Sequence, residues 1–137
     1  MHLNNTSQYA IRILNYLANH DNVKLYSAKE LSDILDIPYK FLTKIMTDLA
    51  KANFVVSIRG RDGGFKLARK SSEITIMQIV NTFNQFQTQD DCLLGIGKCD
   101  VNNKCSLHNQ WRGSKEMVDE MFNNTTLQNL EGSGFKI

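Results

Sequence analysis

The sequence of 137 residues has no long apolar run, a single proline and only three cysteines. A helix that spans a membrane needs about 20 consecutive apolar residues, so the sequence argues against an integral membrane protein. The first residues also lack the basic and apolar regions of a signal peptide. Because three is an odd number, a framework of paired disulfides is not expected. We therefore expect a cytoplasmic protein of about one domain, without membrane contact, whose cysteines serve metal or redox chemistry.

Charge is divided unevenly along the chain. The net charge is only +2, but residues 1–70 carry 11 basic and 6 acidic side chains, whereas residues 71–137 carry 5 and 8. An excess of positive charge in the first half suits contact with a polyanion. Charge by itself is a weak indication, and a matching structural motif is needed.

The first half predicts short helices separated by a break. After an amphipathic helix over residues 7–20, capped by Asn5 or Thr6, Ser27 and Glu30 form a capping box that begins a second helix. Pro38 then interrupts the helical pattern, because the residue before a proline avoids helical angles. A third helix is predicted from about Pro38 to Lys51. This order is typical of a helix-turn-helix, whose second helix enters the major groove of DNA.

A basic hairpin follows the third helix. Residues 54–58 favour a strand, residues 60–64 a glycine-rich turn and residues 65–67 a return strand. The fold class expected is therefore mainly α with a small β-hairpin, a winged helix-turn-helix. The alternative is a solvated helix face beside an ordinary surface turn, but the agreement of motif, hairpin and charge favours double-stranded DNA as the partner. Its expected contacts on the third helix and the wing tip are Tyr39, Lys40, Thr43, Lys44, Arg59 and Arg61.

The second half predicts two further helices. A capping box at Thr75 and Gln78 opens a helix that continues to about Phe86. A long helix is predicted from Leu107 to about Asn123, with apolar residues spaced three and four apart in a narrow seam. Such a seam packs against another helix, and a second copy of the chain is the economical partner. We expect a homodimer with Trp111, Val118 and Met121 in its interface.

The three cysteines lie within 14 residues, between the two predicted helices, at the spacing Cys92-x6-Cys99-x5-Cys105. His108 follows Cys105 by three residues, so its imidazole can lie one helical turn from that thiolate and act as a fourth ligand. The spacing by itself leaves open an iron–sulfur cluster, a tetrahedral zinc site, a thiol switch and inert cysteines. Typical zinc motifs use Cys-x2-Cys, and both spacers here are longer.

Several motifs occur together along nearly the whole chain. They are Ser7-x-Tyr9-Ala10-Ile11-Arg12, Ile37-Pro38-x-x-Phe41-Leu42-x-x-Ile45-Met46, Ser57-Ile58-Arg59-Gly60-Arg61-Asp62-Gly63-Gly64-Phe65 and Lys104-Cys105-Ser106-Leu107-His108-x-x-Trp111-Arg112. In these motifs the sequence resembles the winged-helix transcription regulators that include the iron–sulfur regulator IscR, the nitric-oxide sensor NsrR and the iron regulator RirA. The C-terminal motif is most similar to IscR. The resemblance implies a dimer joined through long C-terminal helices.

The resemblance also implies a cofactor. It implies an iron–sulfur cluster held by Cys92, Cys99, Cys105 and His108, with a 2Fe–2S cluster favoured and a 4Fe–4S cluster as the alternative. IscR has a histidine at the position that matches His108. The resemblance to NsrR would instead imply, as fourth ligand, an acidic residue near the N-terminus of the partner subunit. The matching residue here is Gln8, a poor ligand. The first cysteine spacer is one residue longer than in IscR, which leaves the cluster type open.

The expected organisation is a DNA-binding domain over residues 1–86, a cluster-binding loop over 87–106, and a dimerisation helix with the C-terminal segment over 107–130. The expected function is a repressor or activator of transcription whose operator affinity follows the cluster, which senses iron or cluster supply, nitric oxide or redox stress. A cluster-free thiol switch and a zinc-stabilised regulator are the alternatives. A thiol-dependent enzyme is the competing class, but the sequence has no Cys-x-x-Cys and no phosphate-binding glycine loop.

Overall fold

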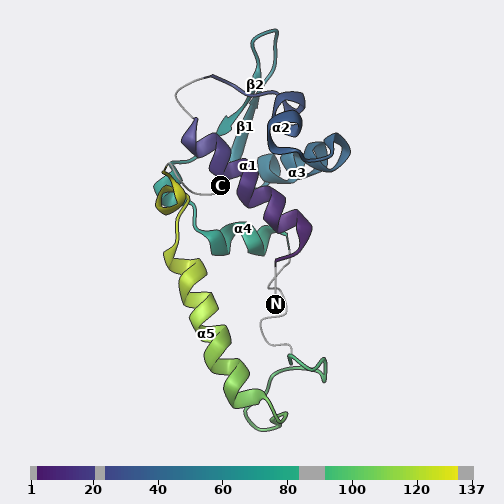
Figure 1. Cartoon of the computed structure of the whole chain (residues 1–137), viewed down its shortest axis with the longest axis vertical. Helices are drawn as coiled ribbons and strands as arrows, with labels where there is room; N and C mark the ends of the chain where they lie inside the picture. The colour runs from purple at the N-terminus through teal and green to yellow at the C-terminus, as the bar shows by residue number, and fades with distance from the viewer. Residues whose placement is uncertain (1–2, 21–23, 84–91, 133–137) are drawn as a thin grey trace.

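The computed structural model describes residues 3–20, 24–83 and 92–132, and Figure 1 shows the arrangement of its elements. Among these residues the architecture is mainly α with one antiparallel hairpin, as the sequence predicts. No described helix is both long and apolar enough to traverse a lipid bilayer. In chain order the elements are α1 (Asn5–Asn19), α2 (Ala28–Leu35), α3 (Tyr39–Lys51), β1 (Val55–Ile58), β2 (Gly64–Leu67), η1 (Ser71–Glu73), α4 (Ile76–Thr82), α5 (His108–Asn124) and η2 (Gln128–Leu130).

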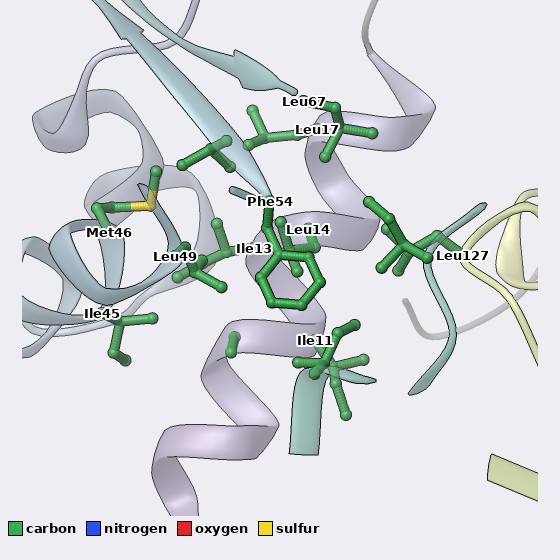
Figure 2. Packing of buried hydrophobic residues seen from close by; sticks show 14 of the residues in the cluster. Ile11, Ile13, Leu14, Leu17, Ile45, Met46, Leu49, Phe54, Leu67 and Leu127 are labelled. Atoms are coloured by element: carbon green, nitrogen blue, oxygen red, sulfur yellow. The ribbon is translucent and has the colours of Figure 1, made fainter. Parts of the chain in front are cut away.

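One apolar core holds the winged-helix part together. The apolar stripes of α1, α3 and α4 supply most of it, and Leu14, Leu49 and Ile79 are completely buried. Phe54, from the segment between α3 and β1, lies between the side chains of α1 and α3 in Figure 2. Burying one large aliphatic side chain contributes about 1.5–3 kcal/mol to folding. The shared core therefore fixes the orientation of α3 relative to the hairpin.

Both predicted capping boxes are confirmed. At the start of α2, Ser27 Oγ accepts a hydrogen bond from the backbone N–H of Glu30 at 3.1 Å, and the Glu30 carboxylate accepts one from the N–H of Ser27 at 2.9 Å. Thr75 and Gln78 exchange the same pair of bonds at the start of α4. These bonds satisfy N–H groups that the first helical turn leaves without partners.

Two helix ends differ from the prediction. The N-cap of α1 is Asn4, whose side chain accepts from the N–H of Ser7 at 2.7 Å, so the predicted cap at Asn5 or Thr6 was wrong by one or two residues. Any of these polar side chains can cap, and only the backbone geometry selects one. Pro38 is the N-cap of α3 and not its first helical residue. The predicted continuation of α4 to Phe86 lies outside the described residues.

The turn between α2 and α3 is closed by local hydrogen bonds. Asp36 has a left-handed backbone conformation with φ of 52°, which reverses the chain directly after α2. The N–H of Ile37 donates to the carbonyl of Ser32 at 3.1 Å, and the hydroxyl of Ser32 donates to the carbonyl of Ile37 at 2.6 Å. Ile37 is itself buried. The turn therefore sets the angle at which α3 leaves α2.

The hairpin is attached to the segment before α2. Val55 pairs with Leu67 and Ile58 with Gly64 in an antiparallel register. In addition, Tyr26 and Phe65 exchange two backbone hydrogen bonds, of 3.2 and 2.7 Å. This isolated β-bridge holds the hairpin against the segment that leads into α2.

Gly64 is the residue at which this attachment is tightest. Its φ is +153°, and a Cβ atom built there would lie 2.8 Å from backbone atoms of Tyr26. We expect Gly64→Ala to destabilise the protein by about 1–3 kcal/mol, because an L side chain is strained at this φ and displaces the wing from Tyr26. Urea denaturation measures the change. The matched control is Gly113→Ala in α5, where a Cβ meets nothing within 4 Å; it is expected to stabilise by about 0.5–1 kcal/mol. Equal stability of Gly64→Ala and the natural protein would contradict the prediction.

Candidate functional site

The outer face of α3 carries the residues predicted to contact DNA. Tyr39, Lys40 and Lys44 are exposed, and Thr43 is half-buried between them. The opposite face, with Leu42, Ile45, Met46 and Leu49, is buried in the core. This division follows from the helical period, which places residues three and four apart on the same side.

Phe41 is a feature of this surface that the sequence analysis did not single out. Its side chain is 56% exposed although it is a large apolar group. It lines a hollow of about 780 Å³ that is bounded by the start of α1, the side of α3 and the end of α4, and that also includes Tyr9 and Lys44. The helical period alone predicts that Phe41 is exposed, because it lies off the buried stripe of α3. The sequence analysis used Phe41 only as part of a family motif.

The wing tip presents the other predicted contacts. Arg59 and Arg61 are exposed, and the tip is closed by a bond from the N–H of Gly63 to the carbonyl of Gly60 at 3.1 Å. Figure 1 shows the hairpin extending beyond the helices. Within the described ranges, the salt bridges are Lys24–Glu30, Lys29–Asp33 and Arg112–Glu116, and none engages the basic residues of α3 or the tip. Their charge is therefore open to an external anion.

The three cysteines and His108 surround one small cavity at the far end of α5. The cavity measures about 170 Å³, and all four predicted ligands line it. The loop folds back on itself through a bond from the N–H of Cys92 to the carbonyl of Gly97 at 3.0 Å. Gly97 has a φ of 64°, a conformation that glycine adopts readily. Residues 87–91, the first part of the predicted cluster loop, lie outside the described residues.

The four side chains approach one another in two pairs. Cys99 Sγ lies 3.3 Å from His108 Nδ1, and the side chains of Cys92 and Cys105 interact so that each shifts the pKa of the other. In the described ranges, no three His, Cys, Asp or Glu side chains converge on a point where they could hold a single metal ion. The two pairs instead lie along the wall of the shared cavity.

Backbone N–H groups point at the sulfur of Cys92. The N–H of Leu94, the hydrogen bond from Cys105 and the N–H of Ile96 lower the pKa of the Cys92 thiol, while burial opposes them. For Cys105, the hydrogen bond to Cys92 raises the pKa, and the N–H of Leu107 acts in the opposite direction. N–H groups directed at sulfur stabilise a thiolate, which is the form that binds metal.

His108 is unusual among the polar residues of the loop because it is only 4% exposed. Its Nδ1 faces Cys99, while its buried Nε2 has no hydrogen-bond partner within the described part of the chain. A buried polar nitrogen without a partner is costly. An additional group bound in the cavity, such as a metal cluster, could supply that partner.

The predicted dimer residues lie on α5, but they are not equally accessible. Met121 is exposed, whereas Trp111 and Val118 are half-buried in the single chain. The most exposed apolar side chain of α5 is that of Met117, at 73%, which the predicted seam omitted. The sequence pattern identified the helix and its apolar residues. The period alone did not determine which of these residues are covered by other parts of the same chain.

Comparison with known proteins identifies the family of this chain. The model of the Rrf2 family, described as an iron-dependent transcriptional regulator, matches residues 3–132. The chain belongs to the Rrf2 family. It is therefore related to transcription regulators, and the mainly helical fold with its hairpin is the winged-helix fold of Rrf2 structures.

Individual relatives align with different lengths of the chain. A helix-turn-helix transcriptional regulator of Aquifex aeolicus is 35% identical over 133 residues, which cover 95% of this chain and 91% of the relative. The NsrR regulator of Shouchella clausii is 38% identical over 91 residues, 66% of this chain and 58% of its own length. The IscR regulator of Vibrio cholerae is 27% identical over 130 residues, 95% of this chain and 75% of IscR.

Solved structures give the same architecture. The structure of CymR, the global cysteine regulator of B. subtilis, superposes with a TM-score of 0.80 at 22% identity and covers 95% of both chains. IscR of T. potens superposes with a TM-score of 0.74 at 20% identity and covers 95% of this chain and 85% of its own. At these identities the similarity establishes the fold.

Proposed function

We propose that this Rrf2 protein is a DNA-binding transcription regulator whose operator affinity is controlled by an iron–sulfur cluster held by Cys92, Cys99, Cys105 and His108. The observation that carries the proposal is the gathering of these four donors around one cavity. The family description, an iron-dependent regulator, supports iron as the metal. The function is therefore regulation of transcription in response to iron or cluster supply, nitric oxide or redox stress.

The residues present fit such a cluster. Three thiols and one imidazole are the donors that iron–sulfur clusters accept. Backbone N–H groups of Leu94 and Ile96 directed at Cys92 would stabilise a ligating sulfur. The buried Nε2 of His108 lacks a partner among the described residues, and a metal–ligand bond would satisfy it. When bound, the cluster would supply a centre that can be oxidised, nitrosylated or lost.

The pairing of donors favours a 2Fe–2S cluster. A 2Fe–2S cluster would be held by two pairs of protein ligands, and here Cys99 lies beside His108 while Cys92 interacts with Cys105. A structural zinc ion needs four donors around one centre, and within the described ranges no three candidate donors converge in that way. We therefore keep zinc as the weaker alternative.

A thiol switch is the second candidate, and one observation favours it. Cys92 and Cys105 line the same cavity and shift the pKa of each other, so their two thiols are candidates for a disulfide. In that case oxidant alone, without iron or sulfide, would change the DNA affinity. Treating apo-protein with a disulfide oxidant and measuring promoter binding separates this mechanism from the cluster.

The proposed DNA surface combines the outer face of α3 with the wing tip. Lys40 and Lys44 would contact phosphates or guanines in the major groove, with Tyr39 and Thr43 beside them. Arg59 and Arg61 would reach phosphates or a minor groove. The absence of ion-pair partners for these basic groups in the described part of the chain supports an external anion as their partner.

The deciding experiment is anaerobic purification followed by absorbance, iron and sulfide analysis, and DNA binding of the holo and apo forms across genomic fragments. We expect iron and sulfide in equal amounts, and a fragment whose affinity differs between the two forms. Protein that contains zinc, or holo and apo forms with the same affinity for every bound fragment, would contradict the proposal.

We also propose that two copies pair through α5. The helix has 17 residues, and only His108 among them is buried. Met117 and Met121 are exposed apolar side chains on the helix, and Leu107 is another directly before its first residue. A long helix with an uncovered apolar side gains most of its stability from packing against a partner, and a second copy offers the same surface by two-fold symmetry.

Met117→Glu tests this pairing. A charged side chain would have to be buried in the interface, so we expect the dimer dissociation constant to rise by about a hundredfold or more. Analytical ultracentrifugation over a concentration series measures it. Asn123→Glu adds the same charge at an exposed position that lies off the apolar surface and serves as the control. A dimer unaffected by Met117→Glu would place the interface elsewhere.

A further inference from the structure

The segment that follows α5 returns to the winged-helix domain and pairs with the segment that enters α4. The N–H of Leu127 donates to the carbonyl of Ile74 at 2.9 Å, and the N–H of Ile76 donates to the carbonyl of Thr125 at 2.9 Å. An antiparallel bridge lies between these two bonds. The clasp, as we call this paired structure, consists of residues 74–76 and 125–127.

Leu127 attaches the clasp to the core. Its side chain and that of Ile74 are completely buried. Figure 2 shows Leu127 in the cluster that also contains Leu14 and Leu17 of α1. The C-terminal segment is therefore an integral part of the packing that positions the DNA-binding elements.

A second contact joins the same two regions. The hydroxyl of Ser71 in η1 donates to the carboxylate of Glu131 at 2.6 Å, and η1 packs against η2. Since η1 begins four residues after Leu67, the last residue of β2, the C-terminal segment contacts the link between the wing and α4. The clasp thus lies at the base of the wing.

Helix α5 joins the clasp to the cysteine loop. His108, a proposed cluster ligand, is its first residue, and its last residue lies three positions before Leu127. A helix of 17 residues spans about 25 Å and is stiff over that length. Figure 1 shows α5 as a rod with the cysteine loop at one end and the winged-helix domain at the other. Helix α5 therefore gives a displacement of the loop a stiff path to the clasp.

We propose that the clasp is the element through which the state of the cysteine loop reaches the wing, and that Leu127 is its positioning residue. This inference rests on the proposed function, because it needs a loop whose structure depends on the cluster. Ordering of the loop fixes α5, and the clasp passes this constraint to η1 and to the base of β2. Coupling of two sites requires such an element, one that both sites bias.

The first test uses the natural protein. Hydrogen exchange followed by mass spectrometry, or by NMR of the Ile76 and Leu127 amides, compares anaerobic holo- and apo-protein. We expect exchange of these two amides to slow at least fivefold on cluster assembly. The Phe65 amide, bonded to Tyr26 away from the clasp, reports on general stabilisation. Unchanged exchange at Ile76 and Leu127, or an equal change at Phe65, would overturn the inference.

The second test separates coupling from stability. Leu127→Ala, with the milder Leu127→Val as a folded substitute, is compared with Leu17→Ala, which removes an equally large buried side chain from the same core. We expect the Leu127 variants to keep their cluster absorbance while the ratio of holo to apo promoter affinity falls at least fivefold toward one. Leu17→Ala should keep the natural ratio.

The outcomes are distinguishable. If the natural protein itself has a ratio of one, the proposed function fails and the clasp inference fails with it. If the natural protein shows a clear ratio and the Leu127 variants retain it, only the clasp inference fails. Loss of the ratio in Leu17→Ala as well would mean that general destabilisation, and not the clasp, uncouples the loop from DNA.

Discussion

Replacing Cys99 by alanine is expected to abolish cluster assembly and with it the difference between holo and apo DNA binding. Cys99 lines the cavity and lies 3.3 Å from His108, so its removal leaves one donor pair with a single member. Anaerobically purified Cys99→Ala should contain background iron and sulfide. Its promoter affinity, measured by fluorescence anisotropy, should equal that of natural apo-protein and should not respond to reconstitution.

Two further variants make this experiment decisive. His108→Ala should impair the cluster as Cys99→Ala does, whereas Gln8→Ala should not, because the Gln8 side chain is a poor ligand that donates to the carbonyl of Leu3 in the single chain. The reverse result would assign the fourth ligand to the partner subunit. A Cys99→Ala protein that still responds to iron and sulfide would refute the assignment of this residue. A variant that responds to oxidant alone would indicate a Cys92–Cys105 thiol switch.

Removing both arginines of the wing tip is the second large effect. In Arg59→Ala/Arg61→Ala we expect promoter affinity to fall about tenfold or more, because two unpaired cationic groups no longer neutralise phosphates. If both arginines bind phosphates, the slope of log affinity against log salt should become shallower by about 1.8, or about 0.9 for each phosphate that is no longer neutralised. Anisotropy titrations at a series of salt concentrations measure both quantities.

The control for the wing is Arg112→Ala. This arginine has the same charge but lies on α5, where it pairs with Glu116 at 3.1 Å, and its removal should leave the salt slope unchanged. A wing variant with the natural affinity and slope would exclude the tip from the DNA surface. A loss of affinity confined to one operator sequence, with little change in slope, would instead mean that the arginines read bases or groove shape.

The cysteine loop and the proposed DNA surface lie at opposite ends of α5, so a signal from one must travel along the chain to reach the other. The cavity lined by Cys92, Cys99 and Cys105 includes no residue of α3 or the hairpin. The clasp offers one route, through the base of the wing, and pairing of α5 helices offers another, through the spacing of the two wings in a dimer. The Leu127 variants test the first route and Met117→Glu tests the second, so their effects on the holo-to-apo ratio can be compared.

Local features of the fold were predictable from the sequence because short-range physics determines them. The capping boxes at Ser27 and Thr75 need only residues three apart, and the break at Pro38 needs only the steric clash of its ring. The buried face of α3 follows from the helical period. The exposed basic face and the wing followed from the same local patterns, and so did the glycine-rich turn.

The cluster residues were predictable only in part. Their spacing indicated metal or redox chemistry, and the family resemblance indicated iron and sulfur. The closeness of Cys99 and His108, the N–H groups directed at Cys92 and the His108 Nε2, which has no partner among the described residues, depend on how the loop folds back through Gly97. No periodic pattern governs such a loop, so the sequence could not show these features.

The sequence by itself therefore determined the winged-helix class, the exposed basic face of α3 and the set of candidate ligands, because composition, period and capping act within a few residues. The tertiary structure alone decided which apolar residues stay uncovered, as with Phe41 and Met117, and which distant segments meet. Leu127 is the clearest case. Burial is a property of the whole packed core, and only the folding of the complete domain brings this C-terminal leucine into the core with α1.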